Sequence, residues 1–157
     1  MSQKYYNASI RNLTYRLRAF RDNIPNMLEE IIRDKEDVIV SAIANDQLYR
    51  RGIDGKGVKI MSYMPYKPST IRAKRKKGQP TTRVTLRDTG RFYSGMKVVF
   101  TDDGFYVTSD DSKADKLKAK YGDAIFRLTN ENLNRILRVH IRREFVKRLK
   151  KQAHARK

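Results

Sequence analysis

The spacing of hydrophobic residues is helical over the first third of the chain. Apolar residues recur every three or four positions at first, at Ile10, Leu13, Leu17 and Phe20. This pattern predicts an amphipathic helix within residues 1–24. Asn23-Ile24-Pro25 interrupts it, and proline is tolerated in the first turn of a helix. We therefore expect a second, longer helix over residues 25–51, which Gly52 ends.

The middle of the chain alternates between apolar and polar residues. Val84 and Leu86 alternate with polar neighbours from Arg83 to Arg87, which predicts a half-buried strand. Asp88-Thr89-Gly90 breaks this alternation, and a short aromatic turn with Phe92 follows. The runs Met96–Thr101 and Phe105–Ser109 flank Asp102-Asp103-Gly104, a sequence typical of a hairpin turn. These two runs are expected to pair antiparallel.

Helical spacing returns after the hairpin. Polar residues 109–112 are expected to cap a helix that Tyr121-Gly122 ends, and Thr129 or Asn130 to cap a final one. The final helix has a clear apolar stripe, formed by Leu133, Ile136, Leu137, Ile141, Phe145 and Leu149. The pattern therefore predicts an α+β fold, in which a small antiparallel sheet packs against long amphipathic N- and C-terminal helices.

The pattern indicates a single domain over residues 1–157, without internal repeats. Within it we expect loops and the sheet in residues 52–109, the C-terminal helices in 110–151 and a frayed tail in 152–157. Only 39% of residues are apolar, so the core is expected to be thin and its burial to be completed by neighbouring subunits.

Several classes of protein are disfavoured. Cysteine is absent, which excludes disulfides and thiolate metal sites. No apolar run approaches the roughly 20 residues that span a bilayer. Residues 1–7 lack the apolar core of a signal peptide, so we expect a protein that is made and used, or assembled, in a cytoplasm.

Charge is the strongest compositional signal. Lys and Arg number 36 against 17 Asp and Glu, a formal net charge of +19, which attracts polyanions such as nucleic acid or an acidic protein. The densest basic cluster consists of Arg72, Lys74, Arg75, Lys76 and Lys77. It suits a loop that contacts phosphates or a partner, and equally a solvated loop.

Few residues offer catalytic chemistry. The two histidines, His140 and His154, lack metal-ligand spacing, and the aspartate pairs at 102–103 and 110–111 are explained by turns and caps. The glycine-rich segment 52–57 matches no phosphate-binding pattern and is read as a flexible turn. We expect neither an enzyme nor a cofactor or metal. A Mg²⁺ nuclease that uses those aspartates is a weaker alternative.

The order of several segments resembles a known family. Gln47-Leu48-Tyr49-Arg50-Arg51-Gly52 ends the long helix, and Ser69-Thr70-Ile71 and a lysine-rich loop follow it. A motif of Leu86, Asp88, Thr89, Gly90 and Phe92 then leads into the hairpin. Together these segments are similar to the neck and tail-completion proteins of tailed bacteriophages (virion morphogenesis, putative minor tail), in the type found in phages of Bacteroidetes. The similarity runs from about Asp46 to Phe145. Leu128-Thr129-Asn130-Glu131 stands where family members carry a proline before the last helix.

The resemblance implies a non-enzymatic structural protein of the virion. It implies a head–tail connector that forms a homo-oligomeric ring, contacts portal or adaptor and tail proteins, and surrounds the path of the packaged phage DNA. The implied location is the head–tail junction, after assembly in the host cytoplasm, with no membrane. The alternative, from charge alone, is a sequence-independent DNA-binding protein with a basic surface.

Overall fold

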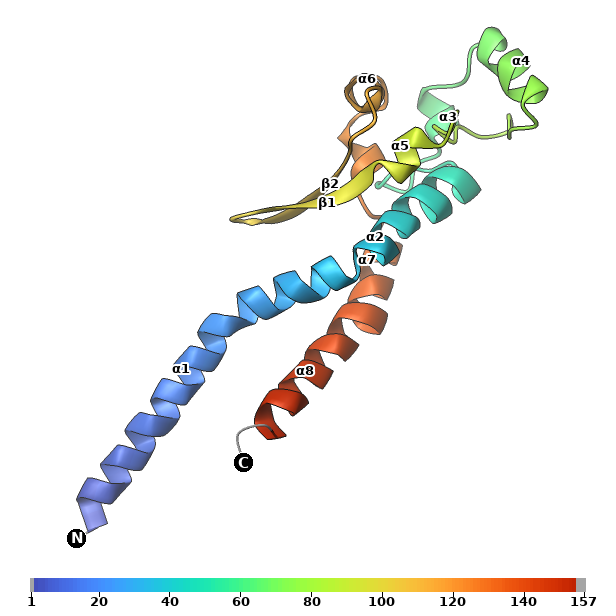
Figure 1. Ribbon diagram of the computed structural model, residues 1–157. Helices are drawn as coiled ribbons and strands as arrows, with labels where there is room; N and C mark the ends of the chain where they lie inside the picture. Colours follow the sequence, from blue (N-terminus) through green and yellow to red (C-terminus); the bar gives the residue numbers. More distant parts are fainter. Residues whose placement is uncertain (1, 155–157) are drawn as a thin grey trace.

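The computed structural model describes the backbone of residues 2–154 and the side chains of residues 11–152. It begins with α1 (Ser2–Asp34), which continues through Pro25. The predicted boundary at Pro25 is therefore wrong. Proline inside a helix removes one backbone hydrogen bond and crowds the preceding turn, so it bends a helix without necessarily ending it. Figure 1 shows α1 with a bend along its length.

The actual interruption lies ten residues later, at Lys35, where a single turn residue separates α1 from α2 (Glu36–Ser41). The chain continues directly into η1 (Ala42–Arg51), a π-helix whose wider turns bury Ala42, Ile43, Ala44, Gln47 and Leu48. Gly52 ends it in the left-handed conformation, at φ 63°, as its position after the last helical residue predicts.

The hairpin confirms its prediction almost residue for residue. β1 (Met96–Thr101) pairs antiparallel with β2 (Gly104–Ser109), with Val98 opposite Val107. The short helix α5 (Arg91–Ser94) precedes it. The outer edge of β1 is partly covered, because the Val98 N–H donates to the Glu36 carboxylate at 2.7 Å. The hairpin therefore lies against α2, as Figure 1 shows.

The predicted strand at residues 83–87 is wrong. The segment is extended but pairs with no strand among the described residues, and Leu86 adopts a left-handed backbone with φ 56°. Tyrosine side chains replace the missing ladder. The Thr85 N–H donates to Tyr66 Oη at 2.9 Å, and the Thr85 carbonyl accepts from Tyr93 Oη. Val84, Thr85 and Leu86 are all buried, so the apolar alternation reflects core packing rather than sheet formation.

Two of the remaining helices precede the hairpin and five follow it in the described part of the chain. Their bounds are α3 (Ile60–Tyr63), α4 (Pro68–Lys76), α6 (Ala114–Tyr121), η2 (Asp123–Phe126), α7 (Asn130–Ile136), η3 (Leu137–Ile141) and α8 (Arg142–His154). Thr129 caps α7, since its hydroxyl accepts from the Asn132 N–H at 3.2 Å. α8 continues through Gln152 to His154, where a frayed tail was predicted, and residues 155–157 lie outside the described part.

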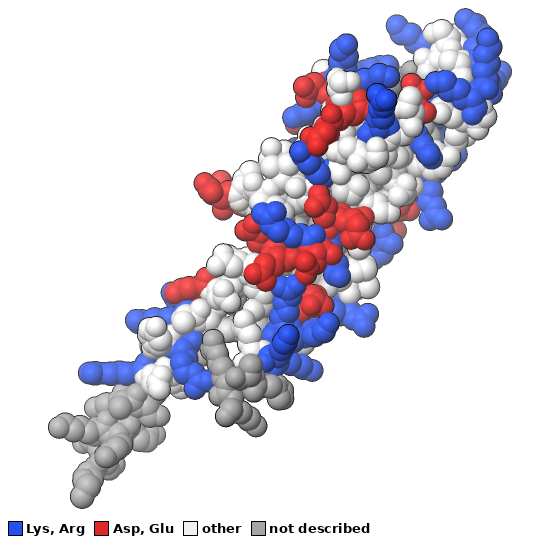
Figure 2. Space-filling view, viewed as in Figure 1, with Lys and Arg blue, Asp and Glu red and all other residues white. Residues whose placement is uncertain are grey.

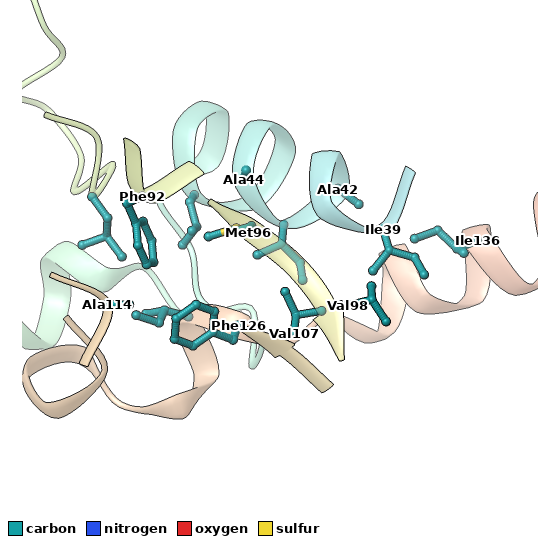
Figure 3. Close-up of a cluster of buried hydrophobic side chains, with 14 of the residues drawn as sticks. Ile39, Ala42, Ala44, Phe92, Met96, Val98, Val107, Ala114, Phe126 and Ile136 are labelled. Atoms are coloured by element: carbon teal, nitrogen blue, oxygen red, sulfur yellow. The ribbon is translucent and has the colours of Figure 1, made fainter. Parts of the chain in front are cut away.

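The core lies where the hairpin, α5 and η2 meet the central helices. Figure 3 shows Phe92, Met96, Val98, Val107 and Phe126 in this cluster. The Phe92 and Phe126 rings meet edge to face, with centroids 5.6 Å apart. α1 and α8 extend from this body like two legs (Figure 1). The α+β class, with long terminal helices and a small antiparallel sheet, is confirmed.

Charge is divided along the molecule. Figure 2 shows acidic side chains gathered across the middle of this face, with further acidic side chains among the basic ones nearer the upper end. Glu29, Glu30, Asp34, Glu36 and Asp37 fall in nine consecutive residues of α1 and α2. Arg148 of α8 joins this band, because its guanidinium pairs with both Glu30 and Asp34 of α1.

Candidate interaction surfaces

The predicted basic cluster lies on α4 and just beyond it. Pro68 stands at the start of the helix, where a missing N–H costs nothing. Arg72, Arg75 and Lys76 are exposed and form no ion pair with other described side chains. They are therefore available to an anionic partner.

Lys74 differs from its neighbours because it is buried. Its ammonium donates to the Arg87 carbonyl at 2.6 Å and to Gln79 Oε1 at 3.0 Å. It also lies 5.1 Å from the centre of the Tyr66 ring, within range of a cation–π contact. A buried ammonium with these partners holds the loop after α4 against the body, so it does not belong to the exposed basic surface.

Lys77, the last residue of the cluster, contacts Asp88 of the predicted motif. Its ammonium forms an ion pair with Asp88, and Lys113 lies 3.6 Å from the other oxygen of that carboxylate. The hydrogen bond from Lys77 lowers the pKa of the Asp88 carboxyl below its usual value, with the charges of Lys77 and Lys113 acting in the same direction. Asp88 thus ties α4 to the start of α6.

The other motif residues shape one corner of the chain. Gly90 adopts φ 94°, a left-handed conformation that favours glycine, just before α5. The Thr89 hydroxyl accepts weakly from the Arg91 N–H, at 3.4 Å. Leu86 and Phe92 are buried in the core. The structure therefore gives Leu86, Asp88, Thr89, Gly90 and Phe92 a shared structural role, the turn that brings the chain into the hairpin.

The glycine-rich segment 52–57 is a loop fixed by hydrogen bonds, which we call the held loop. The expectation of a flexible turn is therefore wrong. The buried Asp54 carboxylate accepts from the N–H groups of Lys56 and Val58 and from Tyr63 Oη. The Gly55 N–H donates to the Ala124 carbonyl at 2.7 Å. Burial, followed by the charge of Asp54, raises the pKa of the Tyr63 phenol to about 12. The loop therefore docks on η2 by its own hydrogen bonds.

His140 shares the lining of one pocket with Asp37 and Asp46, but the structure shows no metal-ligand set among the described residues. No group of three or more His, Asp or Glu side chains among those residues could hold a metal ion. The Asp102–Asp103 pair lies at the exposed hairpin turn, and Asp111 instead accepts from the Lys113 N–H near the start of α6. His140 is partly buried in η3, and the side chain of His154 lies outside the described ones.

Two further surfaces are not predicted from the sequence. The first is a basic, shallow groove on the outer side of α8, lined by Arg138, Arg142, Arg143, Val146, Lys147 and Lys150. These basic residues are visible in the sequence, where their spacing indicates the exposed side of an amphipathic helix.

The second surface is an apolar hollow of about 440 Å³ between β2 and α7, which we call the β2–α7 hollow. Its apolar lining includes Ile43, Phe105, Tyr106, Phe126, Leu128 and Leu133. Leu133 was predicted to lie in the buried stripe of the last helix, but it is 38% exposed, and Leu137 is also exposed. No local signal reveals this hollow, because its residues come from distant parts of the chain.

An apolar stripe on α1 is also left uncovered. We call residues 11–24 of α1 the arm. Leu13 and Leu17, one helical turn apart, are 55% and 59% exposed, although they continue the side of the helix that buries Met27 and Ile31. The arm therefore extends the apolar side of α1 beyond the body that covers it.

Comparisons with known proteins add no relative: no family model, curated protein or solved structure matches the chain.

None of the helices in the described residues combines the length and the apolar content that a membrane crossing requires.

Proposed function

We propose that this protein is a structural, non-enzymatic subunit of a tailed-phage virion. In this role it is a ring-forming head–tail connector, a neck or tail-completion subunit that joins portal and tail around the DNA path. The observation that carries the proposal is the uncovered apolar side of the arm. Leu13 and Leu17 expose more than half of their surface in the monomer. Covering them with another chain lowers the free energy, because apolar surface leaves water.

The shape supports an assembly subunit in the same way. The buried cluster reaches from the upper body to Met27 and Ile31 of α1, while the N-terminal part of α1 extends beyond it (Figure 1). Extended legs with partly buried Phe145 and Leu149 complete their burial when they pack beside neighbouring copies. The ordered segments from Asp46 to Phe145 that resemble the phage family agree with this role.

The test is incorporation into particles. Phage whose gene for this protein is inactivated should accumulate DNA-filled heads without attached tails, and electron microscopy of wild-type particles should place a ring of the protein at the head–tail junction. If the protein stays monomeric and never enters particles, the proposal fails.

Sequence-independent DNA binding remains a second candidate, and the basic groove on α8 favours it. Three exposed cations there, Arg142, Arg143 and Lys147, lie within six residues. The Glu144 carboxylate between them lies 3.4 Å from Arg148 and 3.7 Å from Lys147, so it offsets part of this positive charge. A helix with this surface can follow the phosphates of a duplex without reading bases.

The salt dependence of binding distinguishes two possible DNA surfaces. Each lost phosphate contact should reduce the slope of log K against log salt by about 0.9. We would compare an α8 variant (Arg142, Arg143 and Lys147 to Ala), an α4 variant (Arg72, Arg75 and Lys76 to Ala) and the exposed-loop control Lys56→Ala. Lys74 stays unchanged because it is structural. A slope that neither triple variant changes would remove both surfaces from a DNA interface.

A further inference from the structure

The arm and the β2–α7 hollow are both uncovered, and they lie in different places. In Figure 1 the N-terminal part of α1 extends well away from β1, β2 and α7. One copy therefore cannot bring its own arm into its own hollow without breaking the fold. Two copies can do so, because the arm of one can reach the hollow of the other.

The two surfaces are complementary in chemistry. The arm presents Leu13 and Leu17 at the spacing with which a helix inserts apolar side chains into a groove. The hollow offers a matching apolar floor, with Tyr106 53% and Leu133 38% exposed at its rim. Its charged lining consists of Lys118, Asp123 and Arg127, of which the first two already form an ion pair. It therefore suits an apolar side chain better than a polar small molecule.

Charge favours the same pairing. The arm carries four arginines against one aspartate, and Arg11, Arg16 and Arg18 form no ion pair with other described side chains. Beside the hollow, the hairpin turn holds Asp102 and Asp103, which are exposed and equally unpaired among those side chains. Opposite charges at the rim of an apolar contact set orientation and speed association.

We propose that the arm of one protomer docks in the β2–α7 hollow of the next, with Leu13 and Leu17 inside and the arginines of the arm near Asp102 and Asp103. The inference rests on the proposed ring and assigns its subunit interface. Because the two surfaces differ, the contact is heterologous. Such contacts close into a ring when the rotation between neighbours allows it, and otherwise continue as a filament.

Two variants that each retain one surface test this directly. The arm variant is Leu13→Asp/Leu17→Asp, at exposed positions that leave the core intact. The hollow variant is Tyr106→Arg/Leu133→Arg. Each should associate at least roughly tenfold more weakly than wild type and sediment as a monomer. Mixed one to one, they should form a heterodimer through the single intact pair of surfaces, and nothing larger. Val58→Asp and Val58→Arg, at an exposed apolar residue outside both surfaces, should assemble as wild type.

Circular dichroism would check that the hollow variant is folded. A charge swap at exposed positions tests the same contact without that variant. Asp102→Lys/Asp103→Lys, in the exposed turn, should weaken assembly, and adding Arg16→Glu/Arg18→Glu in the same chain should restore it.

The outcomes separate the interface from the function. Wild-type rings together with arm-variant rings would overturn the interface and leave the connector role standing. Two monomeric variants that do not pair on mixing would also overturn the interface. A heterodimer from the mixture, with open filaments from wild type, would support the interface and contradict the closed ring. A wild type that stays monomeric up to millimolar concentration would overturn the interface, and particle incorporation would then decide the function alone.

Discussion

Gln47 of η1 connects the first half of the chain to the segment between η2 and α7 in the second half. It is fully buried in η1, and its amide N–H donates to the Arg127 carbonyl at 2.9 Å. Its amide oxygen accepts from the Thr129 N–H at 2.8 Å and from Asn132 Nδ2 at 3.0 Å. One side chain thus satisfies the backbone on both sides of Leu128, between η2 and α7.

Replacing Gln47 with leucine should therefore be costly. The change leaves the Arg127 carbonyl and the buried Thr129 N–H without this partner, and each buried group orphaned in this way costs about 1–3 kcal/mol. We expect the free energy of unfolding in urea to fall by at least about 2 kcal/mol. Asn45→Ala is the matched control, since that exposed side chain on the same helix bonds only Ser41. Similar unfolding midpoints for the two variants would contradict this role of Gln47.

Tyr63 provides a pH-dependent test of the held loop. Its pKa is raised to about 12 in the folded protein, against about 10 in an unfolded chain. Between these two values the folded state retains a proton that the unfolded state has lost, so this contribution to stability is complete below pH 10 and disappears as the pH rises through 12. The stability difference between wild type and Tyr63→Phe should therefore narrow from pH 10 to pH 12 in chemical unfolding. A constant difference would show that Asp54 and burial do not act on this phenol.

At the scale of elements, the sequence predicts a helix or turn well when the deciding residues are neighbours in the chain. It predicts an element poorly when that element depends on a distant segment. Asp102-Asp103-Gly104 and the Thr129 cap act within a few residues, so the hairpin and the start of α7 were predictable. The segment around Thr85 shows an alternation typical of a strand, but a strand also needs a neighbour. Here the side chains of Tyr66 and Tyr93 take that place, 19 and 8 residues away in sequence.

The candidate surfaces follow the same division. Basic residues on α4 and α8 can be read from the sequence, but the burial of Lys74 and the β2–α7 hollow depend on segments brought together from across the chain. Pro25 shows the limit of a local rule. The same residue suits the first turn of a helix or a bend within one, and packing of the flanking turns decides between the two.

The cap of α7 yields an element-scale prediction. Thr129→Ala removes the oxygen that accepts from the Asn132 N–H, and N-cap losses of this kind cost about 0.5–2 kcal/mol. Thr129→Ser keeps the oxygen and should recover most of that free energy in thermal unfolding. An alanine variant no less stable than the serine variant would mean that the hydroxyl contributes nothing.

At the scale of the whole molecule, Arg148 links the two legs. From α8 its guanidinium bonds Glu30 at 2.8 Å and also Asp34, both on α1, and it is further held by Glu144 at 3.4 Å. Exposed ion pairs of this kind contribute at most about 1 kcal/mol. They add to the apolar packing of the same two helices, to which α1 contributes Met27 and Ile31 and α8 contributes Phe145 and Leu149.

Arg148→Met keeps an unbranched side chain and removes the charge. We expect stability to change by less than about 1 kcal/mol, while the distance distribution between spin labels on the two legs broadens. The chain has no native cysteine, so labels at the exposed positions Asn26→Cys, outside the arm, and Lys151→Cys report this distance without background. Arg143→Met, on the outer side of α8, serves as the control and should keep the wild-type distribution. Equal distributions in both variants would show that packing alone fixes the legs.

The reach of the Gln47 network has a consequence for biosynthesis. Gln47 and its partners lie 80 to 85 residues apart in sequence. When η1 leaves the ribosome, the groups that complete its buried side have not yet been translated. The N-terminal half of the nascent chain is therefore expected to stay incompletely folded, with apolar surface accessible to chaperones, until residues 127–132 emerge. The final folding step is then expected near the end of synthesis.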